Sequence, residues 1–181
     1  MTNIHLYDII DAMKHAEIKF EVDSFKHVED TLQKLGAKKG TLTVLINYYA
    51  RQDSKDVVKL VHYPDRDEIN ILVESNGTFL LKDRIAVDST EAGLEWLKNK
   101  GYSLVDVVEM HCTEYEYADG TIGLYLINGW LHSVILDFPS EEHEDMKERF
   151  DLTRAQEITI PYNLYLERAG KVQSLTLKGD A

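Results

Sequence analysis

The chain has 181 residues, 44% of them hydrophobic, which is enough to bury a core and fits a single domain over residues 1–181. Its 32 acidic and 20 basic residues give a formal net charge of -12, which argues against nucleic acid or an anionic membrane surface as a partner. A lone cysteine, Cys112, excludes an intramolecular disulfide, and no apolar run approaches the roughly 20 residues that cross a bilayer, so a cytoplasmic protein is expected.

The first predicted strand, residues 15–22, alternates charged and apolar side chains. The charged residues are His15, Glu17, Lys19 and Glu21. In a strand this period places them all on one face. That face would meet water in an open sheet, where cross-strand ion pairs are the simplest interpretation. In a closed barrel it would line a polar interior, where carboxylates can hold metal ions and lysines can hold phosphates.

A strand followed by a helix is predicted twice, because Val-Asp-Ser occurs at 22–24 and at 87–89, and a glycine follows each at the same distance. In the first unit Asp23 or Ser24 can cap a helix whose apolar stripe, Phe25, Val28, Leu32 and Leu35, ends at Gly36. In the second unit Asp88 and Glu91 resemble a capping box, Leu94 and Leu97 are expected to face the core, and Gly101 ends the helix.

Seven further segments have strand character, and turn residues separate them. They are 42–49, 57–63, 68–74, 79–87, 105–117, 121–127 and 130–138. Asn128-Gly129 between two apolar runs is typical of a hairpin. Since strands outnumber helices, the sequence predicts an α+β fold with a mainly antiparallel sheet, closed or nearly closed into a barrel, and helices packed outside.

A third helix is predicted after Pro139, because acidic residues at 141–144 suit its positive end and Lys147 and Arg149 suit its negative end. The tail from 155 to 177 is predicted to hold two extended stretches around Pro161.

The order and spacing of these elements resemble the CYTH superfamily, the triphosphate tunnel enzymes that include class IV adenylyl cyclases and thiamine triphosphatases. Residues 15–19 (HAEIK) are similar to the family's opening Glu-x-Glu-x-Lys strand, and Leu35-Gly36-Ala37 to the LGA that ends its first helix. Tyr48-Tyr49 match an aromatic pair on the second strand, and residues 161–166 (PYNLYL) resemble the C-terminal SYxxLL motif. The resemblance covers about residues 14–167.

The resemblance implies a tunnel in which basic side chains hold a triphosphate and carboxylates hold a divalent ion that polarises it. The candidate phosphate ligands are Lys19, Lys59, Lys82 and Arg84. The candidate ligands of Mg or Mn are Glu17 and Asp137. No residue is assigned a catalytic role.

Several positions depart from the family's pattern. His15 replaces the leading glutamate, Met110 and Cys112 stand where the family has an inward lysine and arginine, and Ile135-Leu136-Asp137 replaces Glu-x-Glu. The four cations must also compete with acidic residues of the proposed interior, namely Glu17, Glu74, Glu114, Glu116 and Asp137. This balance does not offset the desolvation and repulsion of a triphosphate, which carries roughly three to four negative charges.

Two functions remain. The favoured interpretation is a divergent CYTH-like barrel with an eroded triphosphate and metal site, which acts as a noncatalytic module for a small anionic molecule or a protein. The alternative is a metal-dependent phosphohydrolase or cyclase that acts on a triphosphate-containing substrate. Long edge strands are compatible with a homodimer.

Overall fold

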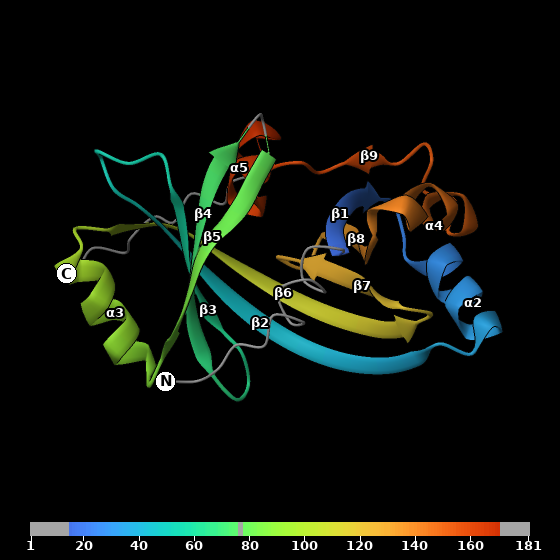
Figure 1. The fold of residues 1–181 in the computed structure, drawn as a ribbon, viewed down its shortest axis with the longest axis horizontal. Coiled ribbons are helices and arrows are strands. Elements are labelled where there is room, and N and C mark those ends of the chain that lie inside the picture. Colours follow the sequence, from blue (N-terminus) through green and yellow to red (C-terminus); the bar gives the residue numbers. More distant parts are fainter. Residues whose placement is uncertain (1–14, 76–77, 171–181) are drawn as a thin grey trace.

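One curled sheet forms the framework of the protein (Figure 1). The computed structural model describes residues 15–75 and 78–170, and the sheet within them has nine strands in the order β5-β4-β3-β2-β6-β7-β8-β1-β9. The strands are β1 (His15–Val22), β2 (Lys38–Ala50), β3 (Val57–His62), β4 (Asp67–Ser75), β5 (Thr78–Val87), β6 (Ser103–Tyr117), β7 (Gly120–Ile127), β8 (Leu131–Pro139) and β9 (Gln156–Glu157). Every neighbouring pair is antiparallel.

The helices α2 (Lys26–Leu35), α3 (Thr90–Asn99) and α4 (His143–Arg149) cover the outer face of this sheet. Leu32 of α2 and Met146 of α4 pack with Phe20 of β1 in one outer cluster. Leu97 of α3 packs with Leu60 of β3 in another. Figure 1 shows α2 and α4 at one end of the sheet and α3 at the other. The helices therefore cover the outer face in two separate groups, one at each end of the sheet.

The opposite face is the inner one, around which the sheet curls. Four strands separate β3 from β1 in the sheet order, yet the charges of Lys59 on β3 and Lys19 on β1 influence each other. A flat sheet would hold those strands too far apart, because each strand step is about 4.8 Å. The end strands β5 and β9 are not paired with each other in the described part of the chain, so the barrel is curled but open.

The predicted α+β class, the antiparallel sheet and the outer helices are confirmed. All eight predicted strands occur, with ends that differ by a few residues. Gly36 ends α2 in the left-handed conformation, with φ of 69°, as its position predicted. The third predicted helix is a 3-10 turn (Ser140–Glu142) that continues as α4. No helix in the described ranges is long and apolar enough to span a membrane.

Three local predictions were wrong. The residue that caps α2 is Phe25, without a side-chain cap, because the Oγ of Ser24 accepts a hydrogen bond from the Lys26 amide two residues away instead. Ser89 rather than Asp88 caps α3 and accepts from the amide of Ala92. Leu94 does not face the core but is 43% exposed.

The tail was also predicted wrongly, because it forms the helix α5 (Tyr162–Arg168) after the two-residue strand β9. Tyr162 and Leu166 lie one helical turn apart, and both are buried against the inner face of the sheet. This burial favours a helix over an extended stretch. Residues 171–177 of the predicted tail lie outside the described residues.

The packing of α2 predicts a difference between two leucines of the same helix. Leu32 is fully buried, whereas Leu35 is 40% exposed. Leu32→Ala should lower the free energy of unfolding by about 2 to 5 kcal/mol, because it leaves a cavity between α2 and the sheet. Leu35→Ala is the matched control and should cost less than about 1 kcal/mol. Urea denaturation of both variants measures this, and equal losses would contradict the packing of α2.

Candidate functional site

The inner face of β1 carries the charged residues that the sequence singled out. Glu17 lies directly opposite Asp137 of β8, and Lys19 lies opposite Ile135. Two carboxylates therefore meet across this strand pair, and Mg²⁺ commonly takes one or two protein carboxylates together with substrate phosphates. No group of three or more His, Cys, Asp or Glu side chains that could hold a metal occurs within residues 15–75 and 78–170. The side chain of His15 lies outside the described part of the structure.

Lys19 and Lys59 lie on the inner face against aromatic rings. The Nζ of Lys19 is 5.4 Å from the ring centroid of Tyr162, and that of Lys59 is 5.8 Å from the ring centroid of Tyr48. These distances are in the range of cation–π attraction. Burial, reinforced by the charge of Lys19 and opposed by that of Glu17, lowers the pKa of Lys59 to about 8. Lys59 is therefore a partly desolvated cation without an ion-pair partner among the described residues.

Arg84 is engaged by a carboxylate of the protein. Its Nε is 3.7 Å from Oε1 of Glu68, which is buried with 6% exposure. The same Oε1 accepts hydrogen bonds from the hydroxyl of Tyr63 at 3.1 Å and from Nδ2 of Asn70 at 3.0 Å. Hydrogen bonds of this kind are what a buried carboxylate requires. Arg84, which is 62% exposed, therefore has a carboxylate partner within the chain.

Lys82 is also paired within the chain, since its Nζ lies 3.4 Å from Oδ2 of Asp56. The pairing of β4 with β5 shifts register between Ile71 and Leu72, where Asp83 faces Ile71 and Leu81 faces Leu72. Lys82 is the extra residue of this bulge and has no partner across the pair. The bulge places its side chain near the connection between β2 and β3.

Apolar and aromatic side chains fill the middle of the inner face. Twelve buried residues form this inner cluster: Val44, Ile46, Tyr48, Val61, Val108, Met110, Ile127, Leu131, Ile135, Ile158, Tyr162 and Leu166. The last two come from α5, which closes the cluster. The hydroxyl of Tyr162 is 2.9 Å from Oγ of Ser133 on β8. The interior is therefore packed where a tunnel would need charged side chains.

The residues that replace the family's charged side chains belong to this packed interior. Met110 and Ile135 are part of the inner cluster, and Cys112 is buried beside Tyr125. Burial raises the pKa of the Cys112 thiol to about 11, helped by the charge of Glu114 and opposed by a hydrogen bond with Tyr125. A protonated buried thiol is a packing group rather than a nucleophile at neutral pH.

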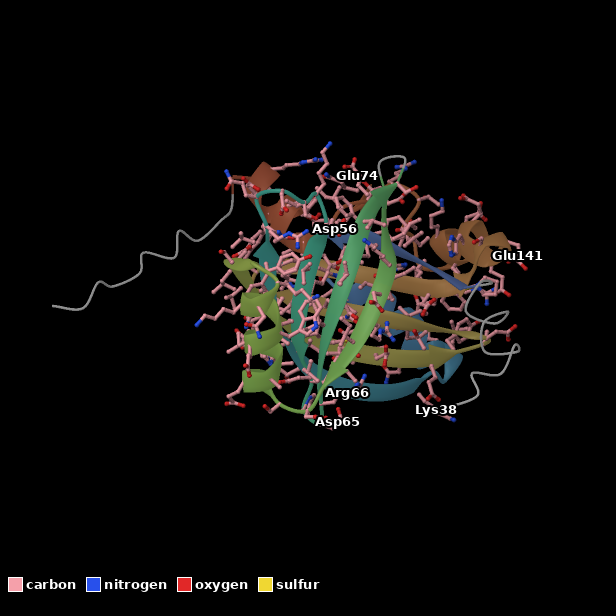
Figure 2. All side chains as sticks on the ribbon, turned by 60° about the vertical axis from the view of Figure 1, so that its left-hand side comes forward. Lys38, Asp56, Asp65, Arg66, Glu74 and Glu141 are labelled. Atoms are coloured by element: carbon pink, nitrogen blue, oxygen red, sulfur yellow. The ribbon has the colours of Figure 1, made fainter. Side chains whose placement is uncertain are left out.

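The remaining acidic candidates do not gather at one point. Glu114 and Glu116 are exposed near the far end of β6, and Glu116 forms an ion pair with Lys38 at 3.4 Å. Glu74 lies at the opposite end of the sheet, close to Asp56, as Figure 2 shows. The structure thus brings together Glu17, Asp137 and Lys19. Glu116 lies in the same row of the sheet, with Thr121 between it and Asp137, whereas Glu74 lies apart from all of them on β4.

A cavity that the sequence did not indicate opens at the end of the sheet where α5 lies. This α5 pocket has a volume of about 800 Å³ and is bordered by the connection of β2 to β3, the start of β6 and α5. Asp106, Asn163 and Glu167 are among its lining residues. The pocket depends on α5 being a helix, which the tail prediction missed. The spacing of Tyr162 and Leu166, four residues apart, was the signal that pointed to it.

Glu68 was also missed as the partner of Arg84. Its sequence context, a charged residue beside the apolar Ile69 and Ile71, indicated a strand but not a buried carboxylate. Two basic residues reach it, Arg66 at 3.9 Å and Arg84 at 3.7 Å, and the approach of Arg84 depends on the pairing of β4 with β5, which no local pattern reveals.

No protein-family model matches the sequence, and no curated protein matches it. Solved structures do match. The PH1012 protein of Pyrococcus horikoshii OT3 is 18% identical, with a TM-score of 0.66 over 78% of this chain and 94% of that one. A "putative adenylate cyclase" from Vibrio parahaemolyticus is 11% identical, with a TM-score of 0.64 over 84% of this chain and 97% of that one.

A third structure, "putative adenylyl cyclase HpAC1" from Hippeastrum, is 10% identical, with a TM-score of 0.59 over 88% of this chain and 98% of that one. Its description ascribes to it a dominant triphosphatase activity. Likeness at such identities is evidence of a shared fold and not of shared chemistry. The likeness confirms the fold that the resemblance implied: this chain shares with these structures an α+β architecture built on one curled antiparallel sheet.

Proposed function

We propose that this protein is a noncatalytic member of the CYTH-like fold, in which the triphosphate and metal site is eroded and the barrel acts as a binding module. The observation that carries the proposal is the inner cluster. Its side chains, among them Met110, Ile135 and Tyr162, are buried in contact with one another. A triphosphate would have to displace this packing, which buries apolar surface worth about 25 cal/mol per Å².

The state of the four candidate phosphate ligands supports the same proposal. Arg84 and Lys82 have carboxylate partners in Glu68 and Asp56, so a phosphate would have to compete for them. Only Lys19 and Lys59 remain beside the aromatic rings of the inner cluster. Two lysines do not balance the roughly three to four charges of a triphosphate.

The residues present also fit a divalent ion poorly. Glu17 and Asp137 lie opposite each other, but the next pair on the inner face of these two strands is Lys19 and Ile135, which supplies no third carboxylate. A Mg²⁺ or Mn²⁺ held by two carboxylates relies on phosphate oxygens for further ligands. Since the interior offers those phosphates little charge, we derive no metal-assisted step for this chain.

A metal-dependent phosphohydrolase or cyclase is the second candidate. It is favoured by one specific observation, the meeting of Glu17 and Asp137 across β1 and β8 with Lys19 two residues away. In this alternative Glu17 and Asp137 would hold Mg or Mn, and Lys19, Lys59, Lys82 and Arg84 would hold the triphosphate. The triphosphatase activity ascribed to the Hippeastrum protein gives this candidate its reaction class.

The proposal predicts little or no hydrolysis of triphosphates. Purified protein should release phosphate from inorganic triphosphate, thiamine triphosphate or ATP at the rate of a buffer control, with Mg²⁺ or Mn²⁺ present. The Hippeastrum protein, assayed in parallel, serves as the positive control. Turnover above the control that disappears in Glu17→Gln and Asp137→Asn would establish the second candidate instead.

The desolvation of Lys59 predicts a stability that depends on pH. Its folded pKa of about 8 is below the ordinary value of 10.5, so the folded state loses this proton first as the pH rises. Below about pH 8 the folded state therefore bears the whole free-energy cost of burying the charged lysine. This cost decreases between pH 8 and 10.5. Lys59→Met should raise the free energy of unfolding by about 1 to 3 kcal/mol near neutral pH. The gain should shrink as the pH approaches 10.5.

Denaturant unfolding of wild type and variant across this pH range measures the effect. Lys55→Met, at an exposed lysine of the β2–β3 connection, is the control and should change stability little at any pH. Added inorganic triphosphate supplies a second comparison. If it stabilised the wild type and not Lys59→Met, the lysine would be part of a working phosphate site, and the noncatalytic proposal would be wrong.

A further inference from the structure

Exposed apolar side chains border the α5 pocket. Val105 of β6 lines the pocket and is 54% exposed. Phe79 of β5 also lines it, and Leu81, two residues further along this strand, is 48% exposed. Because side chains two residues apart in a strand point to the same face, Leu81 continues the apolar wall that Phe79 begins. Exposed apolar surface of this kind marks a groove that another segment covers.

The pocket has the size and the charge for a peptide segment with basic residues. Its volume of about 800 Å³ is in the usual range of ligand pockets, roughly 300 to 1,000 Å³. Its acidic lining residues are Asp56, Glu74, Asp106 and Glu167, and its basic ones are Lys55 and Arg168. Figure 2 shows Asp56 and Glu74 at this end of the molecule. Since the wall is both acidic and apolar, it suits an occupant that combines positive charge with apolar side chains.

The chain itself leads such a segment to the pocket. Arg168, in the last turn of α5, is part of the wall, and the described part of the chain ends two residues later at Gly170. Gly170 is left-handed, with φ of 65°, and this conformation turns the chain where it leaves the helix. Residues 171–181 follow in the sequence (KVQSLTLKGDA) and can span about 36 Å when fully extended. The segment therefore starts at the pocket wall and is long enough to follow it.

The composition of residues 171–178 matches the wall. Three of these residues are apolar (Val172, Leu175 and Leu177), two are basic (Lys171 and Lys178), and none is acidic. A segment that is attached to its own binding surface has an effective concentration on the order of millimolar. Contacts too weak to hold a free peptide are therefore sufficient to hold this segment.

We propose that residues 171–178 occupy the α5 pocket, where Val172, Leu175 and Leu177 cover the apolar wall and Lys171 and Lys178 pair with its carboxylates. The segment then closes this end of the barrel to other ligands. The proposal goes beyond the binding role proposed above and does not depend on it, because none of the twelve buried residues of the inner cluster lines the pocket.

An introduced thiol on the pocket wall tests the proposal in the full chain. The thiol of Val105→Cys should react with N-ethylmaleimide about tenfold more slowly beside the native segment than in a protein that also carries Leu175→Asp and Leu177→Asp. The native Cys112 is 1% exposed and interferes little. Leu94→Cys is the control, because Leu94 is 43% exposed on α3 and does not line the pocket. Its labelling rate should be the same with both segments.

Equal labelling rates of Val105→Cys with the native and the altered segment would overturn the proposal. So would a change of the same size in Leu94→Cys, because the altered segment would then act on the whole fold and not on the pocket. The labelling rate is independent of the phosphate-release assay, so neither measurement decides the outcome of the other.

The charge pairing has its own variants. Lys171→Gln combined with Lys178→Gln should raise the labelling rate of Val105→Cys about two- to fivefold at low ionic strength. Lys34→Gln combined with Lys98→Gln is the charge-matched control, at exposed lysines of α2 and α3 outside the pocket, and should leave the rate unchanged. Equal effects of both pairs would mean that net charge holds the segment, and the assigned pairing would be wrong.

Dilution identifies the source of the segment. Protection of Val105→Cys by the chain's own segment does not depend on protein concentration, so the labelling rate should stay constant when the protein is diluted. Protection that disappears on dilution would mean that a second copy supplies the segment. That result would overturn the proposal that each chain fills its own pocket.

Discussion

The arrangement of the whole interior depends on the packing of α5 against the inner face of the sheet. Tyr162 and Leu166 complete a cluster to which β2, β3, β6, β7 and β8 all contribute. Without them, apolar side chains such as Val44 and Ile135 would line an open trough exposed to water. The helix is only seven residues long, and a helix of that length has little stability of its own. Its fold is therefore imposed by the surface that it covers.

The same packing decides what the charged residues are able to do. A charged group needs water, a ligand or a counter-charge, and the four cations of this chain meet that need in different surroundings. Arg84 pairs with the buried Glu68, Lys82 pairs with the half-buried Asp56, and Lys19 and Lys59 lie over aromatic rings. Lys59 has the least compensation, which its lowered pKa reflects. A barrel that evolved to bind triphosphate would instead leave such cations free for phosphate oxygens.

Local patterns in the sequence predicted the sheet well, because the period of two and the turn residues act over a few neighbours. The alternation in β1 and the Asn128-Gly129 turn are of this kind. The inward direction of Glu17 and Lys19 followed from the family resemblance. The ion pairs that the other charged candidates form did not. The partners of Lys82 and Arg84 depend on the bulge opposite Ile71 and Leu72, where one extra residue changes which side chains meet. The α5 pocket could not be predicted from the sequence, because its wall combines segments more than 100 residues apart, such as those of Asp56 and Asn163.

The reactivity of Cys112 reports how often the barrel opens. It is the single thiol of the chain, it is 1% exposed, and it lies on β6, the central strand of the sheet. Because the folded state hides the thiol, a labelling reagent can reach it only when the packing around Cys112 opens. The labelling rate, compared with that of a free thiol, then gives the population of open barrels without any introduced probe. A ligand that stabilises the closed sheet would lower the labelling rate of Cys112. A ligand that binds only at the surface would leave this rate unchanged.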